Sequence, residues 1–332
     1  MPFHRLFGRT PPPGPLVLAR TPPLERPAAL AAALGTSLTS VVALERRALD
    51  SGMDLSLLWS ARPGGEEGVA GPPLASVLVI PHPGRTGLLL TGAPRDAAQA
   101  RGLGTLIAHA LEDLGTRRDV RLVQALLDPE DTLRATALRA GGMRHLATLE
   151  YLERPIHTLG GFGPARLPEG WSVAPWDPRE RAMLCALLRR TYEETLDCPG
   201  LSDLRADEDI LQGHLESGEH DPTLWFILRE RGEPAGALLL SPSRASDSVE
   251  IVYLGLARHA RGRGLARALL EHGLHAAASR RERVVSLAVD ARNTPAARLY
   301  ARLDFSPVRR REAWISPVPT ARAAEGAPVA VK

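Results

Sequence analysis

The sequence predicts an α/β protein made of two tandem domains of one fold, each a mixed, mainly antiparallel twisted sheet flanked by helices. Its length, an internal repeat and the order of its elements support this prediction. At about 100 to 200 residues per domain, 332 residues correspond to two domains that can each bury a core. The composition, 44% hydrophobic and 24% charged, is typical of a soluble globular protein.

The internal repeat has a period of 162 residues. QARGLG begins at Gln99, and RGRGLA begins 162 positions later at Arg261. Without a gap, the same offset pairs further identical residues: Val123 with Val285, Asp128 with Asp290, Thr132 with Thr294, Ala135 with Ala297, and Glu150 with Glu312. A glycine turn, a helix, a strand and a second helix that recur in one order indicate a duplicated domain.

The first elements of the second domain follow from hydrophobic periodicity and turn residues. A short strand at Trp171–Ala174 precedes two helices, near Arg179–Glu194 and Asp207–Leu215. The runs Thr223–Arg229 and Pro234–Leu240 flank RERGE, which predicts a hairpin with Gly232 at its tip.

The remaining elements surround the glycine turn. SVEIVYLGL at Ser248–Leu256 predicts a third strand, and RGRGLA opens a helix rich in alanine and leucine that extends to about Ser279. A strand at Val284–Val289 and a helix at Thr294–Leu303 follow. The predicted order is an antiparallel meander, a helix, a strand and a helix.

Domain boundaries are predicted from composition. We expect the first domain at 15–153, a linker at Arg154–Gly170, where glycine and proline are dense, and the second domain at 171–316. Residues 1–14 and 317–332 are rich in proline, alanine and arginine without periodicity, so both are predicted to be disordered tails.

Charge and cysteine content exclude several functional classes. The 41 basic and 38 acidic residues are spread along the chain, so we expect no nucleic-acid partner. No stretch is long and apolar enough for a signal peptide or a membrane span, and a cytoplasmic location is expected. Cys185 and Cys198 match no redox or zinc motif, and the Glu271, His272 and His275 cluster lacks metal-site spacing, so no metal is expected.

The glycine turn is a candidate anion site. A helix N-terminus carries unpaired N–H groups and the positive end of the helix dipole, and glycines allow a pyrophosphate to approach. An ordinary connection from strand to helix would look the same. Arg267 replaces the third glycine of a dinucleotide-binding fingerprint, and no P-loop motif is present.

The segment downstream of the turn makes the assignment more specific. It reads LAVDARNTPAARLYARLDF, from Leu287 to Phe305. With the turn, it resembles the GNAT family of acyl-CoA-dependent N-acetyltransferases, whose motifs are Arg/Gln-x-x-Gly-x-Gly/Ala and Asn-x-x-Ala-x-x-Leu-Tyr-x-x-x-Gly-Phe. The matching residues are Arg261, Gly264, Ala266, Asn293, Ala296, Leu299, Tyr300 and Phe305, while Asp304 replaces the usual glycine.

The resemblance implies acetyl-CoA as cosubstrate and a role for each matching position. Glu250 would be the general base, or else an outward-facing strand carboxylate; Tyr300 would protonate the leaving thiolate, or else pack the helix. The implied cofactor-binding residues lie at the end of the third strand, in the turn and before the last helix: Leu254, Gly255, Leu256, Arg261, Gly262, Arg263, Gly264, Leu265, Ala266, Arg267 and Asn293.

The first copy lacks the proposed proton-transfer groups. Leu88 and Leu138 occupy the positions of Glu250 and Tyr300, and Asp131 that of Asn293. This copy is therefore predicted to be catalytically silent. Its retained turn residues, Gln99, Arg101, Gly102 and Gly104, leave open a second CoA site or a purely supporting role.

The expected reaction is acetylation of a primary amine of a small molecule by the C-terminal domain of a monomer or homodimer. Tyr192, Asp197 and Asp203 are candidate substrate contacts, because they lie in the segment where the family builds its acceptor wall; plain loop polarity is the alternative. A peptide or protein N-acetyltransferase differs only in its acceptor. A non-catalytic acyl-CoA sensor or scaffold would need neither Glu250 nor Tyr300.

Overall fold

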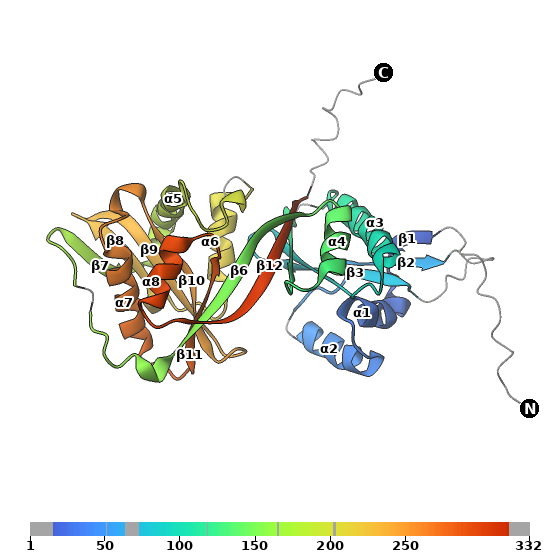
Figure 1. The fold of residues 1–332 in the computed structure, drawn as a ribbon, viewed down its shortest axis with the longest axis horizontal. Coiled ribbons are helices and arrows are strands. Elements are labelled where there is room, and N and C mark those ends of the chain that lie inside the picture. The colour runs from blue at the N-terminus through green and yellow to red at the C-terminus, as the bar shows by residue number, and fades with distance from the viewer. Residues whose placement is uncertain are drawn as a thin grey trace, which may run out of the picture. The chain divides into compact units, whose positions relative to one another are not determined.

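The computed structural model describes residues 16–50, 52–63, 73–117, 119–164, 166–201 and 204–318 (Figure 1). Most of both predicted tails therefore lies outside the described residues. At the C-terminal end, the last strand extends to Pro317, and Val318 is buried.

The chain forms two compact units that do not follow a linear division. One comprises residues 1–145 with 314–332, and the other comprises residues 146–313. The expected linker at Arg154–Gly170, and residues 146–153 of the expected first domain, fall inside the second unit, where Ile156 and Leu159 are buried in the core. Glycine and proline mark turns here as they would in a linker, so composition does not distinguish the two.

The second unit is a sheet in the order β12-β6-β11-β10-β9-β8-β7. Its strands are β6 (Arg144–Pro155, from Leu146 on), β7 (Trp171–Pro175), β8 (Trp225–Glu230), β9 (Glu233–Ser243), β10 (Ser248–Leu256), β11 (Val284–Asp290) and β12 (Ser306–Pro317, up to Ala313). Its helices are α5 (Arg181–Tyr192), α6 (Asp207–Leu215), α7 (Leu265–Ala277) and α8 (Thr294–Ala301). All strands and helices predicted for this half are confirmed within a few residues.

Helices cover both faces of this sheet. The face formed by Val249, Ile251 and Leu287 packs against α7 and α8, and the opposite face of β8 and β9 packs against α5 and α6. The predicted hairpin is also confirmed, because Arg231 and Gly232 both have positive φ, 48° and 92°. This is the backbone of a type I′ turn.

The first unit contains the equivalent elements. They are β1 (Leu16–Arg20), α1 (Arg26–Leu34), α2 (Leu38–Asp50), β2 (Leu58–Pro63), β3 (Ala75–His82), β4 (Thr86–Thr91), α3 (Ala97–Leu114), β5 (Leu122–Leu127) and α4 (Thr132–Ala140). The parallel pair β4 and β5 has the register of β10 and β11 shifted by 162 residues: Thr86 opposes Leu122, as Ser248 opposes Val284. The repeat read from the sequence is therefore present in the backbone.

The prediction of a glycine turn in the first copy is wrong. Helix α3 begins at Ala97, so Gln99, Arg101, Gly102 and Gly104 all lie within the helix. Asp96 starts the helix early, because its carboxylate accepts hydrogen bonds from the N–H groups of Ala98 and Gln99, both at 2.9 Å.

Gly104 has a packing role instead. A Cβ at this position would lie 2.6 Å from the Cβ of Ala140. Glycine therefore allows α3 and α4 to approach closely, which explains why it recurs without a turn.

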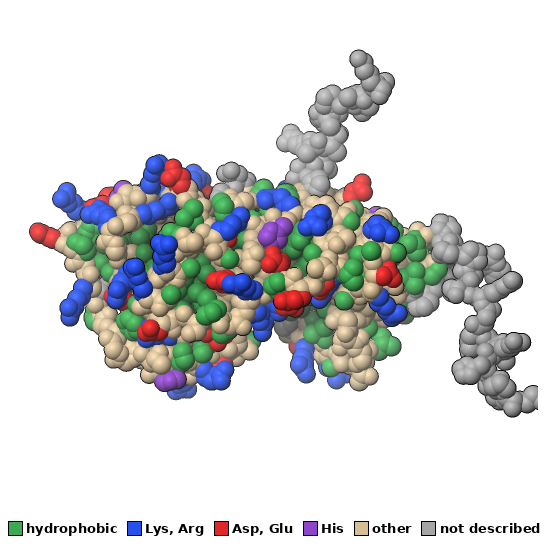
Figure 2. Space-filling model, viewed as in Figure 1, with side chains coloured by type: hydrophobic (Ala, Val, Ile, Leu, Met, Phe, Trp, Pro, Cys, Tyr) green, Lys and Arg blue, Asp and Glu red, His purple; other side chains and the backbone are tan. Residues whose placement is uncertain are grey.

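In the described part of the chain, no single helix has the length and apolar character to cross a bilayer. The bent pair Pro23–Leu34 and Leu38–Ala48 meets the criteria only when both helices are taken together. On the face drawn in Figure 2, acidic and basic side chains are interspersed.

Candidate active site

The second unit has an opening between its two parallel strands. β10 and β11 pair only over Ser248–Glu250 and Val284–Ser286, although the strands continue to Leu256 and Asp290. An irregularity between Ile251 and Tyr253 interrupts the pairing of β10 with β9 at the point where the opening begins. Beyond it, the β10 main chain that faces β11 has no strand partner among the described residues, so its polar groups are available to a ligand.

The glycine turn lies at the end of β10. Gly262 and Gly264 have φ of 73° and 76°, and a Cβ added to either would meet no heavy atom within 4 Å. No side chain caps α7, whose first main-chain bond runs from Ala268 N–H to Gly264 O at 3.2 Å. The N–H groups of the first helical turn therefore have no side-chain acceptor among the described residues, and this arrangement suits an anion.

Arg261 fastens this turn to its surroundings. Its guanidinium donates to the carbonyl oxygens of Leu256 at 2.9 Å, Thr191 at 2.9 Å and Glu193 at 2.7 Å. The side chain thus joins the end of β10 to the end of α5. Because its guanidinium is bound to these carbonyl groups, Arg261 would contact a cofactor through its main chain.

Arg261→Ala is expected to lower the free energy of unfolding by about 2 kcal/mol, because charge-assisted bonds to carbonyls are lost. Thermal and urea denaturation would measure the change. Arg244→Ala is the control, since the Arg244 side chain is 87% exposed and its ion pair, with Glu219, lies at the surface. Equal stability of the two variants would contradict the anchoring role.

Basic side chains surround the turn. Arg263 lies over the ring of Trp171, 5.0 Å from its centroid, and Arg267 pairs with Glu271 at 2.8 Å. Beside the turn, a cavity of about 510 Å³ is lined by Arg190, Glu193, Ala257, Arg258 and His259. Arg263 also pairs with Glu230, and Arg258 pairs with Glu194, so carboxylates balance these arginines. The main-chain N–H groups of the turn remain the groups that suit an anion.

Glu250 lies at the last paired position before the opening. Its neighbours Val249 and Ile251 point into the core below α7, so the carboxylate points to the other face of the sheet. The side chain is half-buried, and burial raises the pKa of its carboxyl. Among the described residues, no cation forms an ion pair with it. A carboxylate in this state accepts a proton more readily than an exposed one.

Tyr300 approaches from the opposite face. It is buried on α8 within the core below α7, with its ring 5.7 Å from that of Phe305. Burial and the charge of Asp197 raise the pKa of its phenol, which therefore stays protonated. The structure does not bring Glu250 and Tyr300 into contact; they flank the sheet on either side.

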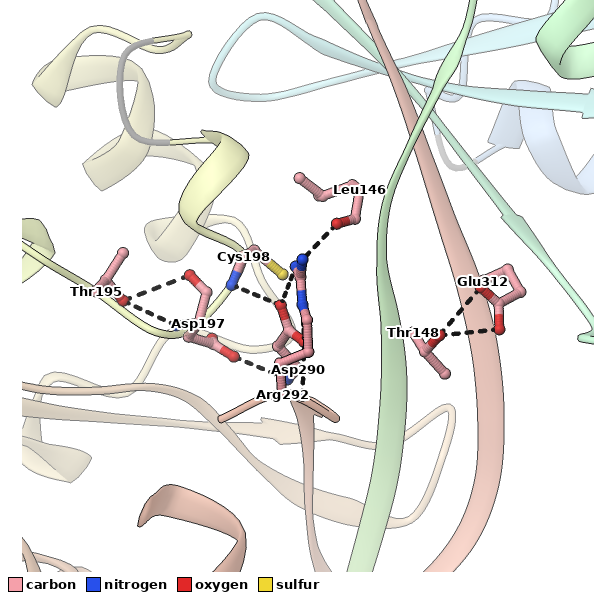
Figure 3. Close-up of polar contacts among 8 residues, drawn as sticks. All are labelled: Leu146, Thr148, Thr195, Asp197, Cys198, Asp290, Arg292 and Glu312. Carbon is pink, nitrogen blue, oxygen red and sulfur yellow. Dashed lines mark hydrogen bonds and ion pairs between the residues drawn. The ribbon is translucent and has the colours of Figure 1, made fainter. Parts of the chain in front are cut away.

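Asp197 and Asn293 lie near Tyr300 in a polar network at the end of β11. The N–H of Asp290 donates to Asp197 at 2.9 Å, and the N–H of Cys198 donates to Asp290 at 3.3 Å (Figure 3). The amide of Asn293 also donates to Asp197, while its oxygen caps α8 at Ala296 N–H, 3.3 Å away. Burial raises the pKa of Asp197.

Arg292 completes this network. It pairs with the fully buried Asp290 at 2.7 Å and donates to the carbonyl of Leu146 at 3.0 Å. The loop that carries Asp197 is thereby held against β11 and the start of β6. The side chain of Asn293 serves this loop and the helix cap, an arrangement that the spacing of the motif does not show.

The other two candidate substrate residues differ in outcome. Tyr192 is packed against Tyr253, with ring centroids 5.3 Å apart, and burial raises the pKa of its phenol. Tyr253 in turn shares a hydrogen bond of 2.6 Å with Thr191. Asp203 lies outside the described residues.

Sequence reasoning missed two polar residues beside Tyr192 and Tyr253. Arg205 Nε and His214 Nε2 are buried and have no hydrogen-bond partner in the described part of the chain. The His214 ring lies 5.3 Å from that of Tyr253, and burial lowers its pKa to about 3, so the imidazole is neutral. One lies in an irregular segment and the other in an amphipathic helix, so no local motif marks them.

The two cysteines are partly buried. Cys185 and Cys198 are free thiols, and burial raises the pKa of Cys198 to about 12. Over the residues that the structure describes, no group of three or more His, Cys, Asp or Glu side chains is arranged to hold a metal ion.

Comparison with known proteins gives one consistent result. Residues 183–305 match the acetyltransferase (GNAT) family. The chain is similar to mycothiol acetyltransferase of Kineococcus radiotolerans, with 33% identity over 208 residues, 62% of this chain and 65% of that protein. It is also similar to mycothiol acetyltransferase of Beutenbergia cavernae, with 31% identity over 268 residues, 70% of this chain and 84% of that protein.

A solved structure extends the likeness to the whole fold. A tandem GNAT protein from the clavulanic acid biosynthesis pathway superimposes with a TM-score of 0.50 at 17% identity. The superposition covers 92% of this chain and 100% of that protein. At this identity the likeness concerns the fold alone, and it supports two tandem domains.

Proposed function

Because the chain belongs to the GNAT family of acetyltransferases, we propose that it transfers an acetyl group from acetyl-CoA to a primary amine of a small molecule. We place the reaction in the unit formed by residues 146–313. The observation that carries this proposal is the opening between β10 and β11, with Glu250 on one face of the sheet and Tyr300 on the other.

The opening and the turn fit the two ends of an acyl-CoA. The uncapped N-terminus of α7, with Gly262 and Gly264, would hold the pyrophosphate. The main chain of Leu254–Leu256 would hold the pantetheine arm and the thioester carbonyl, because its groups facing β11 lack a strand partner. Open space at both glycines is the feature of this chain that fits a phosphate.

The chemistry follows from the two flanking groups. The amine nitrogen attacks the thioester carbon, a C–N bond forms, and the proton on nitrogen passes to the Glu250 carboxylate. The C–S bond breaks, and the Tyr300 hydroxyl protonates the departing sulfur, so CoA leaves as a thiol. Burial supports both roles, because it leaves the carboxylate more basic and the phenol protonated.

A small-molecule acceptor is favoured by the relatives, which are named mycothiol acetyltransferases. Asp197 would orient the acceptor, since it lies near Tyr300 at the edge of the opening. The first unit would not transfer acetyl groups, because Leu88 and Leu138 replace the two proton-transfer residues. It would not bind CoA at α3 either, because the carboxylate of Asp96 already occupies the helix N-terminus.

Titration calorimetry with acetyl-CoA, and a transfer assay on aminosugars, amino-acid amides, polyamines and peptides, test this proposal. Gly264→Glu is expected to weaken acetyl-CoA binding at least tenfold, through bulk and charge repulsion at the anion site. Gly232→Glu is the matched control, because Gly232 also has positive φ and open space but lies at the hairpin tip. Unchanged affinity in Gly264→Glu would remove the site from the turn.

A further inference from the structure

Strand β6 belongs to the first copy by sequence and to the second unit by structure. Its span, Arg144–Pro155, is that of β12, Ser306–Pro317, shifted by 162 residues. In the second unit, however, β6 pairs with β11 along seven residues, from Val284 opposite Pro155 to Asp290 opposite Leu149. The first copy therefore supplies a strand next to the proposed active site.

The register places two polar β6 side chains on the same face as Glu250: Glu153, opposite Ser286, and Tyr151, opposite Ala288. Glu250 opposes Ser286 on β11, and two residues further along β11, Ala288 opposes Tyr151 on β6. These four side chains are all partly exposed. Their neighbours in the sequence, such as Leu152 and Leu287, are buried on the opposite face, where α7 and α8 pack.

Small side chains separate the two polar groups. Neighbouring strands lie about 4.8 Å apart, so Glu250 and Tyr151 have backbones about 10 to 12 Å apart across β11. Ser286 and Ala288 are both small, so no long side chain of β11 stands between Glu250 and the β6 residues Tyr151 and Glu153. A glutamate and a tyrosine that lean toward each other from this distance leave room for about one amino group.

The electrostatics agree with this arrangement. Burial and the charge of Glu250 raise the pKa of the Tyr151 phenol, and Arg309 and Arg311 on β12 oppose that shift. With the phenol protonated, its oxygen can accept a hydrogen bond and its O–H can donate one.

We infer that Tyr151 is the second wall of the acceptor site and that it fixes the acceptor amine opposite Glu250. The inference rests on the proposed function. A neutral primary amine has one lone pair, which would point into the opening between β10 and β11, and two N–H bonds that can each donate a hydrogen bond. One meets the Glu250 carboxylate and the other meets the Tyr151 oxygen. A secondary amine carries a substituent in place of the second N–H, so Tyr151 makes the site selective for primary amines.

The test uses the full chain and two matched pairs of acceptors. Glycinamide and 2-phenylethylamine are the primary amines, and sarcosinamide and N-methyl-2-phenylethylamine are the corresponding secondary amines. Tyr151→Phe is expected to raise KM for the primary amines about fivefold to tenfold, the worth of one hydrogen bond, while KM for acetyl-CoA stays constant. The preference for primary over secondary amines is expected to fall by the same factor.

Glu150→Gln is the matched control, because Glu150 precedes Tyr151 on the same strand but points to the other face, where it pairs with Arg310. It should leave both KM values unchanged. A Tyr151→Phe enzyme with unchanged acceptor KM and unchanged preference overturns the inference, even when Glu250→Gln lowers turnover. Normal turnover in Glu250→Gln, or no transfer by the wild type to these four amines or to the aminosugars, polyamines and peptides of the assay above, overturns the proposed function together with the inference.

Discussion

Replacing Glu250 with glutamine is expected to lower kcat by about a hundredfold or more and to leave the affinity for acetyl-CoA unchanged. The substitution keeps the size and polarity of the side chain and removes only its capacity to take a proton, the typical worth of a general base. Acetyl-CoA contacts the turn and the end of β10 in our proposal, so calorimetric binding should be insensitive to it. Steady-state kinetics and titration calorimetry measure the two quantities separately.

The pH dependence gives the same prediction a second readout. Because burial raises the pKa of Glu250, the wild-type kcat should fall on the acidic side at a pH above the ordinary range of a glutamate. This acidic limb should disappear in Glu250→Gln. Glu233→Gln, an exposed carboxylate at the start of β9, is the control and should keep both the rate and the limb.

The thermal stability of Glu250→Gln should stay the same or rise, whereas its activity should fall. A carboxyl whose pKa is higher in the folded state than in the unfolded state favours folding below its unfolded pKa, and that contribution is lost as the pH rises through the folded pKa. At neutral pH the folded protein therefore bears the cost of a buried charge, which Glu250→Gln removes. The variant should melt at the same temperature as the wild type or above it. A variant that is both as active as the wild type and less stable would make Glu250 a structural carboxylate.

The second half of the fold could be predicted closely because its signals are local. Ser248–Leu256 and Asp207–Leu215 begin and end in the structure where periodicity and turn residues place them. The glycine turn, Asn293 and Tyr300 could also be identified, since their motif spans adjacent elements. Each of these depends on neighbours within a few residues, which the sequence displays directly.

The sequence could not predict that β6, a strand of the first copy, pairs within the second unit, because this pairing depends on a choice between two equivalent strands. β6 and β12 have the same length and occupy the same place in the two repeats. The sequence pattern of each strand is therefore compatible with pairing in either sheet. The sequence of β6 alone does not indicate that this strand pairs with β11. Tyr151 was missed for the same reason: it lies in the first copy, and only its pairing with β11 places it on the same face as Glu250, across that strand.

The first glycine turn shows the converse error. QARGLG resembles RGRGLA, but Asp96 starts α3 before the motif, and the glycines are wound into the helix. A motif fixes local structure only when the residues before it leave the backbone free. In the second copy, residues 261–264 lie before α7, and Arg261 donates to the carbonyl oxygens of Leu256, Thr191 and Glu193.

Removal of β6 is expected to have the largest effect on folding. The fragment 159–318 retains the whole sequence of the second copy but lacks the strand that lies between β11 and β12 in the second unit. Its loss would leave the seven-residue ladder of β11 unpaired and would remove Leu152 and Ile156 from the core. The lost ladder hydrogen bonds, at about 1 kcal/mol each, and the two lost core side chains, at about 2 to 5 kcal/mol each, together match the stability of about 5 to 15 kcal/mol that is usual for a domain.

We therefore expect the fragment 159–318 to show no cooperative thermal transition, whereas the fragment 146–318, which retains β6 from Leu146, should melt cooperatively. Calorimetry of both fragments beside the full chain measures this difference. In the full chain, Leu152→Ala should lower the free energy of unfolding by about 2 to 4 kcal/mol, because Leu152 is 5% exposed and packs in the core below α7. If the fragment 159–318 melted and turned over like the full chain, the second copy would be complete without β6. Tyr151 could then have no part in the reaction, so this experiment also bears on the acceptor site.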